Sequence, residues 1–229
     1  MDLEEAIATT RAIRRYTDEP VADDDLAAIL FAASRAPTGS NRQPYRFVVL
    51  RDGPVATEAK ALLGAAFRAA WGEKAAADGY DRGSGADEDS PKARMARTMQ
   101  RFVDRFESTP VVLLPCYRPY RGLPDRTDGG SVYPAVQNLL LAARGRGLGG
   151  VLTMWHQLVE DDLKRLLGIP EEVAIMGCVA LGHPEGSHGP VRRRPLAELV
   201  YEETWGSSPA WAVDPPGTRF TSAGPPKGR

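Results

Sequence analysis

Arginine residues occur in two short clusters near opposite ends of the chain. Guanidinium groups form paired hydrogen bonds with phosphate oxygens, and a phosphate monoester is nearly dianionic at neutral pH. A single basic cluster is most often solvated surface. Two clusters in a chain with a net charge of −1 also allow the interpretation that both meet at one anion. The clusters are Arg11, Arg14 and Arg15 within residues 10–16, and Arg192, Arg193 and Arg194 within residues 190–195.

A polar stretch, residues 36–45, is the second candidate for chemistry. It lies between an amphipathic run, residues 25–35, and an apolar run, residues 47–50, so the pattern predicts a helix, a polar loop and a strand. Prolines stiffen its two ends and Gly39 permits a sharp bend. Its hydroxyls and carboxamides offer donors and acceptors that suit the mixed edge of a heterocycle, whereas a plain surface turn is the alternative. The polar side chains are Thr38, Ser40, Asn41 and Gln43.

Size and composition favour one main domain without a metal, membrane or nucleic-acid function. A chain of 229 residues with 42% hydrophobic residues can bury one sizeable core. The near-zero net charge gives no general attraction to nucleic acid or membranes, and no apolar run reaches the ~20 residues of a membrane span. The acidic N-terminus lacks a signal-peptide pattern, so a cytoplasmic location is expected. Cys116 and Cys178 are expected to be buried free thiols, and three scattered histidines suggest no metal site.

Hydrophobic periodicity predicts helices and strands in mixed order. Asp23 and Ser131 are expected to cap two of the helices. The helix after Ser131 is apolar over more than one face, which places it in a core or a subunit interface. Helices are expected over residues 3–9, 25–35, 57–71, 93–106, 131–143 and 160–167, and strands over residues 47–50, 110–116, 151–156 and 173–181.

The segment from Gly72 to Lys92 is rich in glycine and acidic residues and is expected to be a mobile flap. With the helical stripe that follows, it forms an insertion at about residues 72–108 that can cover a pocket. Residues 1–206 are expected to form the domain, and residues 207–229, where Pro and Gly dominate, an extended tail. The candidate walls of a substrate pocket are Trp71, Tyr80, Phe102 and His156.

In their order and spacing these motifs resemble those of the FMN-dependent nitroreductase family. The resemblance covers most of residues 3–206. It rests on Thr10-Arg11-Ala12-Ile13-Arg14-Arg15-Tyr16, Ala36-Pro37-Thr38-x-x-Asn41-x-Gln43-Pro44, Gly147-Leu148-Gly149 before a strand, Leu166-Leu167-Gly168-Ile169-Pro170, Leu181-Gly182 and Arg192-Arg193-Arg194-Pro195.

The resemblance implies an α+β fold in which helices surround a mostly antiparallel sheet. It also implies a domain-embracing homodimer with two FMN sites at the interface, and a ping-pong hydride transfer from NADH or NADPH to a nitroaromatic, quinone or related small-molecule acceptor. Relatives with the same fold carry out flavin fragmentation, dehalogenation or azoline oxidation. A non-catalytic flavin-storage protein is a further alternative.

The same resemblance implies roles for individual residues. Arg11 and one or two of the late arginines, assigned to Arg193 and Arg194, hold the FMN phosphate, while Arg14 reaches the pyrimidine edge of the flavin. Ala12 replaces a family serine, so only its backbone is expected to contact the cofactor. The strand residues Leu152, Thr153 and Met154 present backbone groups to flavin N5 and O4, and no side chain is expected to be catalytic because N5 carries the chemistry. The partner chain contributes Pro37, Thr38, Asn41 and Gln43.

Overall fold

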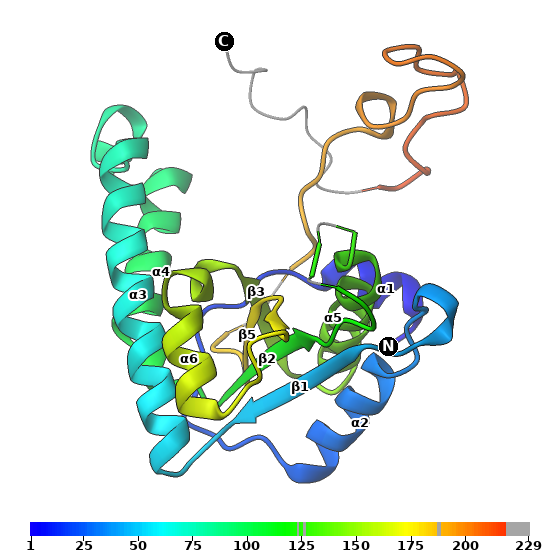
Figure 1. The fold of residues 1–229 in the computed structure, drawn as a ribbon. Coiled ribbons are helices and arrows are strands. Elements are labelled where there is room, and N and C mark those ends of the chain that lie inside the picture. Colours follow the sequence, from blue (N-terminus) through cyan, green and yellow to red (C-terminus); the bar gives the residue numbers. More distant parts are fainter. Residues whose placement is uncertain (123, 126, 187–188, 219–229) are drawn as a thin grey trace. The chain divides into compact units, whose positions relative to one another are not determined.

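The computed structural model describes residues 1–122, 124–125, 127–186 and 189–218. These residues divide into two compact units, one drawn from Met1–Arg11 and His188–Arg229 and the other from Ala12–Ser187 (Figure 1). Helix α1 (Leu3–Thr9) groups with the C-terminal segment. The domain boundary expected after residue 206 stays a prediction. Part of the predicted tail, residues 219–229, lies outside the described residues.

The larger unit is built on an antiparallel sheet, as the resemblance implied. Four strands follow the order β1-β2-β5-β3, and β4 pairs with β2 beside this path. The apolar run before Tyr117 forms β2, whose residues from Val111 to Cys116 are all buried. The strands are β1 (Tyr45–Leu50), β2 (Val111–Tyr117), β3 (Gly149–Thr153), β4 (Ala174–Ile175) and β5 (Cys178–Gly182).

The strand expected over residues 173–181 is interrupted between β4 and β5. Opposite the interruption lies Pro115, which has no N–H to donate to a neighbouring strand. Met176 N donates instead to Pro115 O at 2.7 Å, and the β4–β5 side uses one residue more than β2 between the two paired stretches, as in a β-bulge. Gly177 fits there because a Cβ would lie 2.5 Å from Leu152 Cδ1.

Helices cover both faces of the sheet, and β2 distributes its side chains between the two cores. Val111 and Leu113 pack with α2 (Asp23–Ala33) and α5 (Gly129–Gly145). The alternate residues Val112, Leu114 and Cys116 belong to the other core, where the period of two along a strand places them. That second core also contains residues of α3 (Pro54–Asp78), α4 (Pro91–Asp104) and α6 (Glu160–Leu167). The expected core position of α5 is confirmed, since its buried residues include Val132, Val136, Leu139 and Ala143.

Two expected helix caps are wrong. The N-cap of α2 is Ala22, and Asp23 lies in the first turn, where it forms an ion pair with Arg51. Helix α5 begins at Gly129, so Ser131 is already helical, and its hydroxyl accepts a hydrogen bond from Gly39 N at 3.3 Å. That hydroxyl therefore fixes the polar loop rather than the helix end.

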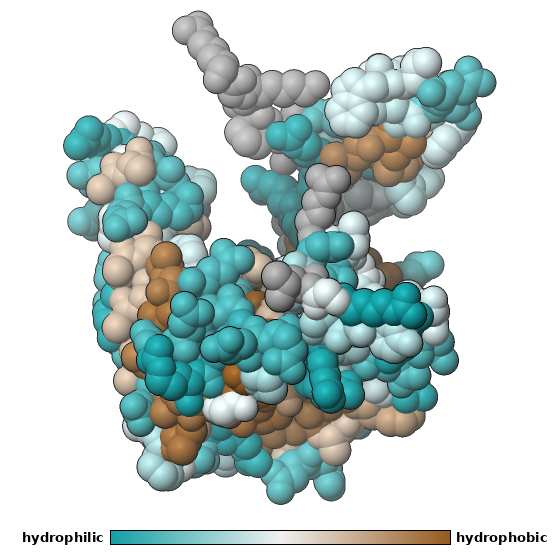
Figure 2. Space-filling model, in the orientation of Figure 1, coloured by the Kyte–Doolittle hydropathy of each residue, from teal (hydrophilic) through white to brown (hydrophobic). Residues whose placement is uncertain are grey.

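The segment expected to be a flap is helical in its first part. Helix α3 continues past Trp71 to Asp78, because the residues after Gly72 include strong helix formers such as Glu73 and Lys74, and it ends at the left-handed Gly79. A short 3-10 helix (Gly83–Ala86) then leads into α4, which runs beside α3 (Figure 1). Figure 2 shows hydrophobic side chains beside α4 and beneath β1, separated by hydrophilic ones.

Candidate active site

The first arginine motif is anchored to the open edge of the sheet. Ile13 N donates to Gly150 O at 3.0 Å, and the Tyr16 hydroxyl donates to Ile13 O at 2.5 Å. The same hydroxyl lies 3.1 Å from Ala180 O in β5. These bonds hold both ends of the segment that carries Arg14, which therefore has a defined place beside β3.

Two glycines allow this segment to approach the strands closely. A Cβ on Gly149 would lie 2.5 Å from Ile13 Cγ1, and one on Gly182 would lie 3.1 Å from the Tyr16 ring. A side chain at Gly149 would displace the Ile13 side chain. The Gly147-Leu148-Gly149 motif therefore serves close packing against the first arginine motif.

Arg14 lines a cavity of about 340 Å³ between the end of β3 and the pair α3 and α4. Two groups of residues singled out in the sequence meet at this cavity. The residues assigned to the flavin ring are Arg14, Leu152, Thr153 and Met154. The residues assigned to the pocket wall are Trp71, Tyr80 and Phe102. Five further lining residues were not singled out as site residues: Lys74, Met95, Met99, Val151 and Trp155.

The aromatic wall of this cavity is fixed by its own contacts. The Trp71 and Tyr80 rings lie 5.3 Å apart between centroids, and Trp71 Nε1 donates to Gln100 Oε1 at 2.9 Å. Phe102 meets Phe106 edge-on at 5.6 Å. Such contacts restrict the rotamers of the wall and provide flat apolar surfaces.

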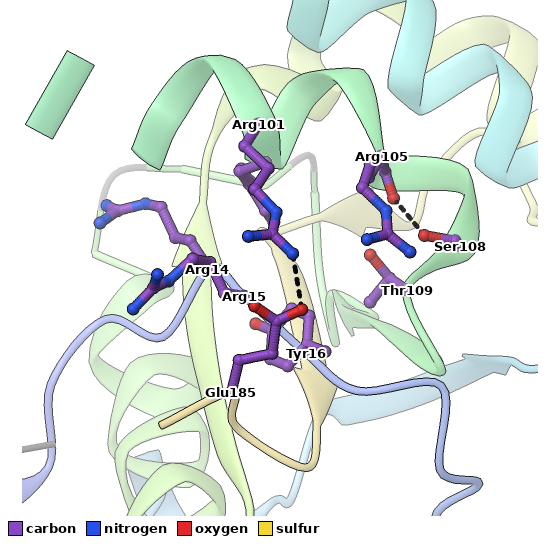
Figure 3. A pocket seen from close by; sticks show the side chains of 9 residues that line it. Arg14, Arg15, Tyr16, Arg101, Arg105, Ser108, Thr109 and Glu185 are labelled. Carbon is purple, nitrogen blue, oxygen red and sulfur yellow. Dashed lines mark hydrogen bonds and ion pairs between the residues drawn. The ribbon is translucent and has the colours of Figure 1, made fainter. Parts of the chain in front are cut away.

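The charges at the cavity are positive. Arg14 and Lys74 line it, and the described lining residues include no aspartate or glutamate. Arg14 also borders a smaller polar pocket, shown in Figure 3, where Arg14 and Arg15 lie on one side. Across that pocket Arg101 reaches Glu185 at 2.7 Å, so this neighbouring site is largely occupied by an ion pair.

The outer edge of β3, where Ile13 binds, carries backbone N–H and C=O groups that point away from the sheet. Since Gly150 O accepts from Ile13 N, the alternation of an antiparallel strand directs the backbone of Leu152 to that same edge. Thr153 faces its partner Cys178 in β5, and its hydroxyl accepts from Trp155 N at 3.4 Å. Leu152 is therefore the strand residue best placed to donate to a ligand.

His156 is a core residue and is not among the described residues that line the cavity. It is fully buried, and its Nε2 lies 2.8 Å from Ile175 O. Burial lowers the pKa of His156, so the ring is neutral and donates from Nε2. Its hydrogen bond joins the segment after β3 to β4.

The polar loop has an unusual backbone. Ser40, Asn41 and Gln43 adopt left-handed φ values of 52°, 52° and 50°. Thr38 Oγ1 accepts from Gln43 N at 3.0 Å, and Gln43 Nε2 donates to Asn41 Oδ1 at 3.3 Å. Strained backbone of this kind is typical of functional loops, although Pro37, Thr38, Asn41 and Gln43 are not among the described lining residues of the cavity.

The other unit contains the remaining arginines assigned to phosphate. Val191 N donates to Ala8 O at 2.9 Å, which joins the start of the late cluster to the end of α1, close in sequence to Arg11. Arg194 lies 4.0 Å from Glu198, and Arg193 Nη1 donates to Arg192 O at 2.9 Å. Arg11 and the late cluster thus belong to one compact unit, while Ala12 and Arg14 belong to the other.

Comparison with known proteins identifies the family. The model of the nitroreductase family matches residues 7–183, which is most of the chain. The chain belongs to the nitroreductase family. This confirms the resemblance inferred from the motifs. It also confirms the nitroreductase-like fold with its antiparallel sheet, and the expectation of an oxidoreductase. Cys116 and Cys178 are buried free thiols, as expected. Among the described residues no cluster of metal ligands occurs, and none of the helices is both long and apolar enough to span a membrane.

Relatives within this family differ in name. An NADH dehydrogenase of Thermus thermophilus is 33% identical over 206 residues, covering 87% of this chain and 95% of the relative. A 5,6-dimethylbenzimidazole synthase of Rhodospirillum rubrum is 28% identical and covers 82% of each chain. A nitroreductase-type protein of Desulfovibrio desulfuricans, solved in complex with FMN, has a TM-score of 0.65 and 29% identity, covering 90% of this chain and 98% of the other.

Proposed function

We propose that the protein is an FMN-dependent NAD(P)H oxidoreductase that reduces a nitroaromatic, quinone or related acceptor. The observation that carries the proposal is the cavity in which Arg14, the end of β3 and an aromatic wall meet. Names among the relatives support the same reaction class, since one is an NADH dehydrogenase and a structural neighbour holds FMN.

The residues of this cavity fit a flavin. An isoalloxazine ring fits beside the strand edge, which supplies backbone donors, and the flat apolar wall lies across the cavity from it. The guanidinium of Arg14 suits the negative charge that gathers near N1 and O2 on reduction. When bound, FMN supplies hydride transfer at its N5 atom. Among the strand residues assigned as backbone donors, the geometry favours Leu152 over Thr153, because Thr153 faces β5.

The residues of the protein bind and orient the flavin and exclude water from it. Arg14 is assigned to the pyrimidine edge, where a fixed cation raises the reduction potential of the ring. Trp71, Tyr80 and Phe102 shield the opposite side of the cavity from solvent. The assignment of the FMN phosphate to Arg11, Arg193 and Arg194 remains part of the proposal.

A homodimer also belongs to the proposal. By the family resemblance a second copy contributes Pro37, Thr38, Asn41 and Gln43 to each flavin. The exposed position of this loop and its left-handed residues support a role in binding, since such backbone is retained where it serves a site.

A spectral titration tests the reaction. We expect the purified protein to be yellow, to bleach under argon with NADH or NADPH, and to recover its colour on addition of nitrofurazone. Double-reciprocal plots at several acceptor concentrations should be parallel, as ping-pong kinetics require. A protein that binds FMN yet is inert to both nicotinamides would contradict the oxidoreductase proposal and leave a storage role.

The relative named 5,6-dimethylbenzimidazole synthase gives a reason to test one alternative, in which the flavin is the substrate rather than the cofactor. Chromatography of FMN after aerobic incubation with NADPH separates the two. Our proposal predicts that FMN is recovered intact. Loss of FMN with formation of 5,6-dimethylbenzimidazole would establish the alternative.

A further inference from the structure

Lys74 gives the cavity a second cation far along the chain from Arg14. It follows Trp71 by three residues on α3, so both side chains lie on one face of the helix. Both line the cavity, together with Tyr80 and the methionines Met95 and Met99 of the α3–α4 pair. A positive charge thus stands beside the aromatic wall rather than beside the strand edge that carries the flavin assignment.

Lys74 forms an exposed ion pair with Asp78, which a ligand carboxylate can replace. Its Nζ lies 2.5 Å from Asp78 Oδ2, one helical turn later, and the two side chains are 50% and 42% exposed. Exposed ion pairs of this type contribute little stability, because water competes for both charges. Asp78 is not among the described lining residues, so Lys74 is the member of the pair that lines the cavity, and its ammonium reaches a ligand there by leaving Asp78.

Two neighbouring cations of the α3–α4 pair donate to backbone oxygens, although the ammonium of Lys92 also lies 5.4 Å from the centre of the Tyr80 ring. Lys92 Nζ donates to the backbone oxygens of Asp78 and Gly79, at 3.2 and 2.7 Å. Arg97 Nη1 donates to Glu88 O at 2.7 Å. Neither Lys92 nor Arg97 is among the described residues that line this cavity.

We propose that Lys74 makes the enzyme selective for aromatic acceptors that carry an anionic substituent such as a carboxylate. The proposal rests on the proposed function, in which Arg14 is committed to the flavin. The apolar wall then binds the acceptor ring, and Lys74 exchanges Asp78 for the acceptor's carboxylate. Neutral acceptors of the same shape lack this second contact.

The test compares two acceptors of nearly equal size, 4-nitrobenzoate and 4-nitrobenzamide, with the FMN-loaded protein. We expect Lys74 to raise the ratio of kcat/KM for the anion over the amide by about fivefold, as one partly exposed ion pair provides, and the ratio to fall with added salt. Lys74→Met should therefore lower the ratio about fivefold, and Lys74→Arg should retain it. Asp78→Asn should increase it, because the competing carboxylate is gone.

Arg82→Met is the matched control. Arg82 also lies near the tip of the α3–α4 pair and pairs with the adjacent Asp81 at 3.7 Å, but it is not among the described lining residues of the cavity. Its loss removes the same charge from the same region and should leave the ratio unchanged. An equal effect of Arg82→Met and Lys74→Met on the ratio, or a ratio that Lys74→Met leaves unchanged, would overturn the proposal.

A binding measurement separates this proposal from the proposed function. Calorimetric titration of the purified protein with benzoate and with benzamide reports selectivity without turnover. Tighter binding of benzoate that is lost in Lys74→Met supports the role of Lys74 even if nicotinamides fail to reduce the protein. Equal binding of benzoate and benzamide overturns that role even if nitroreduction is fast.

Discussion

The hydroxyl of Tyr16 lies 3.1 Å from the carbonyl oxygen of Ala180 and so ties the first arginine motif to β5. The same hydroxyl donates to Ile13 O, so one buried polar group fixes both ends of the turn that presents Arg14. The position of the guanidinium therefore depends on a residue that is not assigned to the cofactor.

Replacing that hydroxyl should loosen the turn. Tyr16→Phe keeps the ring but leaves Ile13 O without its hydroxyl donor, and we expect a loss of about 1 kcal/mol in the free energy of unfolding. FMN affinity should fall as well, because Arg14 loses its fixed place. Urea denaturation and FMN titration check both effects. Weakened FMN binding with unchanged stability would show that the hydroxyl acts on the cofactor directly.

The close approach of Ile13 to β3 should make Gly149 intolerant of a side chain. In Gly149→Ala the added Cβ meets Ile13 Cγ1 at 2.5 Å, and overpacking of this kind costs about 1–3 kcal/mol. Thermal unfolding measures the effect. Gly72→Ala is the control, because a Cβ there meets nothing within 4 Å and should stabilise α3 by about 0.5–1 kcal/mol. The prediction is wrong if both variants gain stability.

His156 should make the protein sensitive to mild acid. Burial lowers its pKa in the native state, while in the unfolded chain the histidine pKa is about 6.5. Below about pH 6.5 the unfolded chain therefore binds a proton at His156 that the native state does not bind. The free energy of unfolding falls as the pH drops further, by up to about 1.4 kcal/mol per pH unit.

The exchange His156→Gln tests this dependence. Glutamine can still donate to Ile175 O but does not titrate, so the unfolding free energy measured between pH 5 and 7 should vary less with pH than in the wild type. The absolute stability is expected to drop, and the slope is the informative quantity. His183→Gln, which removes a histidine beside Glu19, is the control. An unchanged slope in His156→Gln would refute the assignment.

The sequence predicted the parts of the fold that depend on local pattern. The apolar run before Tyr117 gave β2, and the alternation of its side chains accounts for both cores. The ordered motifs pointed to the family, and four of the residues assigned to the flavin do lie together with three of the wall candidates. These successes rest on periodicity and spacing, which the sequence contains directly.

The remaining features depend on contacts between distant segments. Pro115 interrupts the strand opposite to it, Ser131 binds Gly39 rather than its own helix end, and His156 finds Ile175 in the core. None of these partners can be identified from local pattern. Lys74 was missed for a different reason. Glycine and acidic content suggested a flap, and only the continuation of α3 shows that Lys74 follows Trp71 on one helical face.

The most direct test of the flavin assignment is the affinity of FMN for Arg14→Ala and Arg15→Ala, measured side by side by fluorescence titration of the apoprotein. Arg14 lines the cavity, whereas Arg15 belongs to the neighbouring polar pocket, so the two variants lose the same charge at adjacent positions. We predict that Arg14→Ala weakens binding by about tenfold or more, as loss of a charged hydrogen bond does, and that Arg15→Ala stays within about twofold of the wild type. Equal FMN affinity in the two variants would contradict the account.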